Sequence, residues 1–153
     1  MNCLITQTCA IRRIDLTTGQ VETLPGSQGF QTARWSPDGK YIAALQPVRH
    51  QLYLYDVRTE KWRKLADGIT GNDVSWSSDS QSIYASCLGN DTRIVRVSVA
   101  TGKTETAVDL RARDPLGRSE TTDAWFAVTP DGSLVVINWQ QAAEIYSYQV
   151  VSH

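Results

Sequence analysis

The sequence is poor in the residues that catalytic and metal sites most often use. Its 153 residues include only two histidines, His50 and His153, and three cysteines. Nucleophilic catalysis needs a serine or cysteine beside a histidine and a carboxylate, and no Gly-x-Ser-x-Gly segment is present. The cysteines Cys3, Cys9 and Cys87 form no Cys-x-x-Cys pair, which argues against a disulfide framework or a zinc site. We therefore expect free thiols, no cofactor and no enzymatic activity.

Long apolar runs, an excess of one charge and helical periodicity are also missing. No segment approaches the roughly 20 apolar residues of a membrane span, and residues 1–13 lack the features of a signal peptide. The net charge of −1 gives no basic surface for nucleic acid. We expect no nucleic-acid partner, no membrane insertion and a cytoplasmic location for the chain as it stands, although a longer parent protein would allow a periplasmic one. The lack of i, i+3, i+4, i+7 patterns predicts an all-β fold.

Two short motifs recur with a period of about 40 residues, and they alternate along the chain. Both have the composition of tight turns: proline, aspartate and glycine occupy positions that set the backbone angles of a strand–turn–strand unit. The first motif reads WSPDGK at 35–40, WSSDSQ at 76–81 and VTPDGS at 128–133, and the second reads DLTTGQ at 15–20, DVRTEK at 56–61 and SVATGK at 98–103.

Strand repeats with this period predict the stacked blades of a β-propeller. We predict one domain, 1–153, that forms a partial β-propeller of about three and a half four-stranded blades. Apolar segments such as 42–45 should be buried on both faces, and the alternating segment 52–57 should pack on both sides. Trp35, Trp62 and Trp76 recur at repeat positions, so they are expected to pack between blades. The expected units are a half blade at 10–24, blades at 29–66 and 68–110, and an incomplete blade at 121–150.

A partial propeller leaves sheet edges and apolar end faces uncovered, whereas known propellers close with four to eight blades. We therefore expect self-association, most simply as a two-fold dimer that forms a closed ring of six or seven blades. In this ring the N-terminal strands of one copy complete the last blade of the other. Both chain ends offer a third strand, so one strand must be displaced or shared. The open alternative is that the chain is a piece of a longer propeller.

The WSPDGK motif followed by an apolar strand resembles the TolB-like family of bacterial β-propellers. The resemblance extends over about 11–150 and is carried by 14–27, 34–44 and the segment 144–148, which is similar to a terminal strand of such proteins. The chain also resembles the C-terminal blades of bacterial proteins that join such propellers to winged-helix regulator or kinase modules. The resemblance implies an interaction or sensing module. The sequence lacks the other modules, so a regulatory role does not transfer directly.

The segment 111–121 is an insertion that the repeat does not explain. Its three arginines suit a carboxylate or phosphate group, and the alternative is a solvated loop paired with Asp114 and Glu120. Propeller topology places this insertion on the same face as the loops between second and third strands. We predict that this face binds a partner. The candidate binding residues are Arg49, His50, Asn90, Asp91, Arg111, Arg113, Arg118 and Trp139.

These observations favour a non-catalytic propeller that self-assembles and presents one loop face to a protein or small molecule. A second hypothesis is a purely structural fragment, natural, recombined or engineered, without a ligand. A propeller lyase or hydrolase is a third, but the residues for it are lacking. The Asp-Gly turns offer one carboxylate each, too few for a calcium loop.

Overall fold

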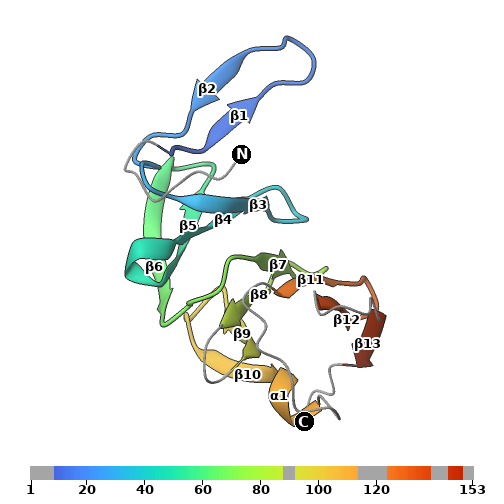
Figure 1. Cartoon of the computed structure of the whole chain (residues 1–153). Coiled ribbons are helices and arrows are strands. Elements are labelled where there is room, and N and C mark those ends of the chain that lie inside the picture. Colours follow the sequence, from blue (N-terminus) through green and yellow to red (C-terminus); the bar gives the residue numbers. More distant parts are fainter. Residues whose placement is uncertain (1–8, 88–91, 114–123, 139–144, 150–153) are drawn as a thin grey trace.

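The computed structural model describes residues 9–87, 92–113, 124–138 and 145–149. Its regular structure there is almost entirely antiparallel β-sheet, as Figure 1 shows. Within the described residues, the helical elements are the 3-10 turn η1 (Pro47–Arg49) and the four-residue helix α1 (Leu110–Arg113). No helix in this part of the chain has the length and apolar character needed to cross a membrane.

Four sheets follow one another along the chain, and in each the strands pair in sequence order. We call them the hairpin (β1–β2), the first sheet (β3–β6), the second sheet (β7–β10) and the third sheet (β11–β13). In Figure 1 the hairpin extends away from the first sheet, and the third sheet lies beside β7. The strands are β1 (Arg12–Ile14), β2 (Val21–Thr23), β3 (Gln31–Trp35), β4 (Tyr41–Gln46), β5 (Gln51–Asp56), β6 (Lys61–Asp67), β7 (Val74–Trp76), β8 (Ser82–Cys87), β9 (Arg93–Ser98), β10 (Thr104–Asp109), β11 (Ala124–Val128), β12 (Ser133–Asn138) and β13 (Ile145–Gln149).

The first repeated motif forms the same turn in all three sheets. In the first sheet, Ser36 Oγ donates to Asp38 Oδ1 at 2.7 Å and accepts the Tyr41 N–H at 2.9 Å. The second sheet reproduces this arrangement, because Ser77 Oγ donates to Asp79 Oδ1 at 2.6 Å and accepts the Ser82 N–H at 2.9 Å. In the third sheet, a Thr129–Asp131 hydrogen bond takes the same place. The sequence motif therefore corresponds to one local structure.

The second motif also forms a repeated turn. Asp15 Oδ1 accepts the backbone N–H groups of Thr17 and Thr18, each at 2.8 Å. Asp56 Oδ1 accepts two N–H groups in the corresponding way, from the second and third residues after it. The fifth residue of the turn has positive φ in each copy, which suits Gly19 at 72° but places Glu60 at 57° in a conformation that favours glycine.

The core lies between successive sheets, as expected for blades stacked face to face. Leu45, Leu52 and Leu54 of the first sheet pack against Val74 and Ile83 of the second. The opposite face of the first sheet packs against Ile11 and Leu24, which flank the hairpin strands, so the predicted alternation along β5 is confirmed. The predicted burial of β4 is also confirmed, because 42–45 is buried throughout.

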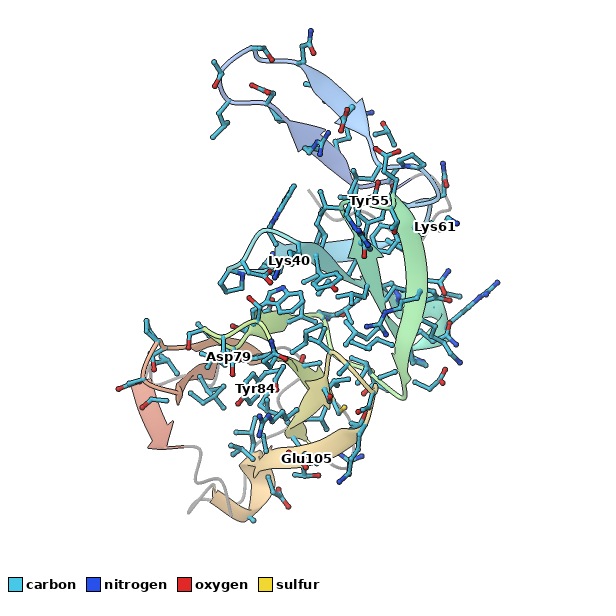
Figure 2. The ribbon with its side chains drawn as sticks, turned by 180° about the vertical axis from the view of Figure 1, so that it is seen from behind. Lys40, Tyr55, Lys61, Asp79, Tyr84 and Glu105 are labelled. Carbon is cyan, nitrogen blue, oxygen red and sulfur yellow. The ribbon has the colours of Figure 1, made fainter. Side chains whose placement is uncertain are left out.

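The second and third sheets share a separate core. Tyr84 and Ile94 of the second sheet pack against Phe126, Leu134 and Val136 of the third. Figure 2 shows Tyr84 on the side of the second sheet that faces the third. The first and second sheets thus each use one face for the preceding sheet and the other for the following one.

Two sequence expectations are wrong. Trp76 is buried with 7% of its surface exposed, but Trp35, at the equivalent repeat position, is 46% exposed. The first sheet covers Trp76. The described hairpin, which precedes the first sheet, lacks the inner strands that would cover Trp35 in the same way. Cys9 is disulfide-bonded, which corrects the expectation of free thiols, whereas Cys87 is a buried free thiol.

Candidate functional site

The described parts of the predicted binding loops lie at one end of the first and second sheets. In the first sheet, the Ile69 N–H donates to the His50 carbonyl at 2.9 Å, and this bond joins the loop after β6 to the loop after β4. In the second sheet, the Leu110 N–H donates to the Thr92 carbonyl at 3.1 Å in the same way. We call this end the loop face; its described residues are 47–50, 68–73, 92 and 110–113.

Arg49 and His50 belong to the tight turn that follows β4. Pro47 starts η1, and the His50 N–H closes the turn onto the Pro47 carbonyl at 3.1 Å. His50 ends the turn in a left-handed conformation with φ of 53°. Both Arg49 and His50 are exposed, as is Val48 with 73% exposure. Two candidate side chains therefore do lie on the loop face and are free to meet a partner.

The insertion begins differently from its predicted form. Its first residues belong to α1, a helical turn that Asp109 caps by accepting the Ala112 N–H at 3.1 Å. Arg111 and Arg113 lie in α1, but the structure does not describe their side chains. In Figure 1, α1 follows β10 of the second sheet. Arg49 and His50 lie in the turn between β4 and β5 of the first sheet. The candidates outside the described residues are Asn90, Asp91, Arg118 and Trp139.

The structure adds two residues beside the loop face, at strand ends, that the sequence did not single out. Gln46 Oε1 and Arg93 Nε are buried atoms that find no hydrogen-bond partner among the described residues. Arg93 is the first residue of β9 and pairs in register with Asp109 of β10. In the first sheet the equivalent pair is Gln51 and Asp67, whose side chains form a 2.8 Å hydrogen bond. Aligning the repeats places Arg93 at the position of Gln51, and this difference in the sequence could have identified Arg93.

Asp73 connects three sheets near their inner strands. Its carboxylate accepts the N–H of Val74 at 3.0 Å and of Phe126 at 3.5 Å, and it lies 3.2 Å from Arg34 Nη2. Nearby, Thr32 adopts a φ of 52°, which is rare for a β-branched residue, and its hydroxyl donates to the Asn72 carbonyl at 2.8 Å. These contacts give Asp73 a structural role between the sheets. No group of three His, Cys, Asp or Glu side chains that could hold a metal ion occurs among the described residues.

The turn aspartates at the other end of the sheets are used by their own turns. The hydrogen bond from the Ser36 hydroxyl, aided by the Lys40 N–H, lowers the pKa of Asp38 from 3.8 to about 2. Hydrogen bonds from the Thr18 and Thr17 backbone N–H groups lower the pKa of Asp15. The pKa values of the remaining turn carboxylates are lowered for the same kind of reason, at Asp56, Asp79 and Asp131. These carboxylates stabilise turns and do not gather into a ligand site.

The comparison with solved structures decides the architecture. TolB from Acinetobacter baumannii superimposes with a TM-score of 0.72 over 95% of this chain at 21% identity, and 36% of TolB is covered. The β-propeller domain of the Trilobed protease from Pyrococcus furiosus, described as having an open velcro topology, gives 0.61 over 92% of this chain and 46% of that domain at 16% identity. An oligogalacturonate lyase in complex with manganese gives 0.67 at 13% identity, over 90% of this chain and 43% of the lyase. The chain is a partial β-propeller.

The resemblance in fold is to TolB and other TolB-like propellers, so each four-stranded sheet is one blade. The chain spans between about a third and a half of the similar propellers compared above. No protein-family model matches the sequence, and no curated protein is similar to it in sequence. Because all three identities are below 25%, the likeness concerns the fold alone.

Proposed function

We propose that this chain is a non-catalytic propeller module that self-assembles into a closed ring and presents its loop face to a protein or small molecule. The observation that carries the proposal is the unequal strand content of the sheets. The first and second sheets have four strands, the hairpin has two and the third sheet has three. The described sheets at the two ends of the arc are therefore incomplete blades.

The two incomplete sheets are complementary. The hairpin precedes the first sheet, and the second repeated motif forms the turn between β1 and β2. In a complete blade this motif joins the third and fourth strands, so β1 and β2 correspond to those strands. The third sheet begins with the first repeated motif and lacks a fourth strand among the described residues. The hairpin of one copy therefore supplies the strand that the third sheet of another copy lacks. Two copies arranged head to tail then form a closed ring of six blades, two complete and one composite blade from each copy.

Exposed edges support this arrangement physically. Among the described strands, β13 pairs with β12 alone, and β1 and β2 pair only with each other. Unpaired strand edges tend to pair with another chain. Ile14, Leu16 and Val21 of the hairpin are exposed, Leu16 to 96%. β13 and the partner's β1 would both act as a third strand, so one of the two is displaced when β2 docks.

The molar mass tests self-assembly directly. Size-exclusion chromatography with light scattering over a dilution series is expected to give a species near twice the 17.0 kDa of the chain. A well-folded monomer at tens of micromolar would refute this part of the proposal. Circular dichroism on the same fractions establishes that the chain is folded.

The loop face requires a separate experiment. Immobilised protein is used to capture partners, and Arg113→Ala and Trp139→Ala are expected to weaken capture without lowering the melting temperature. Lys40→Ala, in a turn at the opposite end of the blade, is the matched control. Equal capture by all variants would argue against the loop face. A dimer that captures nothing would favour the alternative of a purely structural fragment.

A further inference from the structure

Repeat equivalence shows which contact Trp35 lacks. Trp76 ends the inner strand of the second blade, and its indole N–H donates to the Arg34 carbonyl of the first blade at 3.0 Å. Arg34 immediately precedes Trp35, which ends the inner strand of the first blade. Trp35 occupies the same place as Trp76 in its turn motif, yet it is 46% exposed where Trp76 is 7% exposed. The two tryptophans therefore differ in exposure because their neighbouring blades differ.

The residues that follow the hairpin cover part of the face to which Trp35 belongs. Leu24 packs against Ile42 and Tyr55, with Ala33 of the inner strand at the edge of this cluster, and the Trp62 indole N–H donates to the Pro25 carbonyl at 2.8 Å. Figure 2 shows Tyr55 at the base of the hairpin and Lys40, in the turn after the inner strand, farther from it. Trp35 pairs in register with Ile42, so both side chains lie on this face. The described hairpin supplies no inner strand to cover Trp35.

We infer that the part of this face around Trp35 binds β11 of a second copy, with the Trp35 indole N–H donating to the main-chain carbonyl of Ala127 of the partner subunit. Val128 is the counterpart of Trp35 and Trp76 in the third repeat, so Ala127 is the counterpart of Arg34. The inference rests on the self-assembly proposed above and assigns the residues that form its contact.

The third blade offers a suitable partner surface. Phe126, Leu134 and Val136 face the second blade, so the alternate residues Ala127 and Val135 belong to the opposite face. Ala127 is exposed, and among the described strands β11 pairs with β12 alone. A small side chain beside the accepting carbonyl leaves room for an indole ring. Docking β11 on Trp35 also places the partner's third blade beside the hairpin, where β2 supplies its fourth strand.

The first-to-second blade interface within the chain supports the fit. There Asp38 N–H donates to Ser80 Oγ at 3.1 Å, and Thr32 Oγ1 donates to the Asn72 carbonyl, so adjacent turns and inner strands of this repeat hold each other. The Trp76 contact belongs to this same set of inter-blade bonds. The proposed contact between copies therefore reuses an interface that the sequence already forms.

Three variants test the inference by sedimentation velocity over a dilution series. Trp35→Asp places a charge on the docking face and is expected to leave a folded monomer at concentrations where the wild type is dimeric. Trp35→Phe keeps the ring but removes the N–H donor, and is expected to raise the dimer dissociation constant by up to about tenfold. Val48→Asp changes an apolar residue that is 73% exposed on the loop face, and is expected to leave the dissociation constant unchanged.

The outcomes separate this inference from the broader proposal. A wild-type dimer that Trp35→Asp does not weaken would overturn the role of Trp35 and leave self-assembly intact. A monomeric wild type would overturn both. Acrylamide quenching of the wild type compared with Trp35→Phe adds a second readout. Protection of Trp35 in a monomer would mean that a segment of the same chain covers this face, which would also overturn the inference.

Discussion

Replacing Glu60 with glycine should stabilise the protein, because Glu60 holds a backbone conformation that glycine adopts more easily. Glu60 has φ of 57°, and the equivalent residues Gly19 and Gly102 have φ of 72° and 73°. The Glu60 N–H donates to the Asp56 carbonyl at 2.8 Å, as Gly102 does to Ser98 at 2.8 Å, so the turn is the same. The Glu60 side chain is exposed and makes no hydrogen bond or ion pair with the described residues.

The expected gain follows from two opposing terms. A non-glycine residue in the left-handed region costs about 1–2 kcal/mol, because its Cβ crowds the following carbonyl. Glycine loses more backbone entropy on folding, about 0.5–1 kcal/mol relative to alanine. The net gain for Glu60→Gly is therefore about 0.5–1 kcal/mol, equivalent to about 1–4 °C in melting temperature for a chain of this size.

Urea and thermal unfolding at one fixed protein concentration measure the difference, because self-association would make stability depend on concentration. Glu60→Ala is the matched control: it removes the carboxylate but keeps a Cβ in the left-handed region, so it should stay within about 0.5 kcal/mol of the wild type. The reasoning is refuted if the glycine variant is no more stable than the alanine variant. Equal gains in both would mean that the carboxylate, not the backbone, is unfavourable.

Two further predictions concern acid stability and a close approach between backbones. Because the pKa of Asp38 falls from 3.8 to about 2 on folding, its stabilising effect is complete above about pH 4 and is lost as the pH falls toward 2; the acid-induced loss of stability should be smaller in Asp38→Asn, and equal pH profiles would contradict this. A Cβ at Gly71 would lie 2.0 Å from Ser86 Oγ and 2.3 Å from the Ser86 carbonyl oxygen, so Gly71→Ala should cost about 1–3 kcal/mol in urea unfolding. The added change Ser86→Gly should not restore stability, since the carbonyl clash remains.

The scaffold could be predicted from the sequence because its determinants are local. Asp38 and Asp79 receive hydrogen bonds from residues within two positions, so the turn chemistry is readable from adjacent letters. The apolar run of β4 likewise indicates a central strand without knowledge of its neighbours. The period then indicates stacked sheets, because each sheet has two apolar faces to bury.

The exposure of Trp35 could not be predicted in this way. Burial depends on whether a neighbouring blade exists, and equivalent repeat positions differ when one lies at the end of an array. Arg93 Nε, which has no hydrogen-bond partner among the described residues, was missed for a related reason, because its surroundings depend on the cross-strand register that pairs Arg93 with Asp109. The disulfide at Cys9 was missed because cysteine spacing alone does not fix pairing.

The residues that repeat and the residues that bind are therefore expected to be different sets. A turn aspartate such as Asp38 accepts hydrogen bonds from its own turn, which leaves it little capacity to hold a ligand. We expect binding at side chains whose contacts differ from those of their repeat counterparts. Arg93 stands where Gln51 satisfies Asp67, and Trp35 lies open where Trp76 is covered. Substitutions at repeat-matched turn residues should chiefly lower stability, whereas substitutions at these departures should chiefly change association.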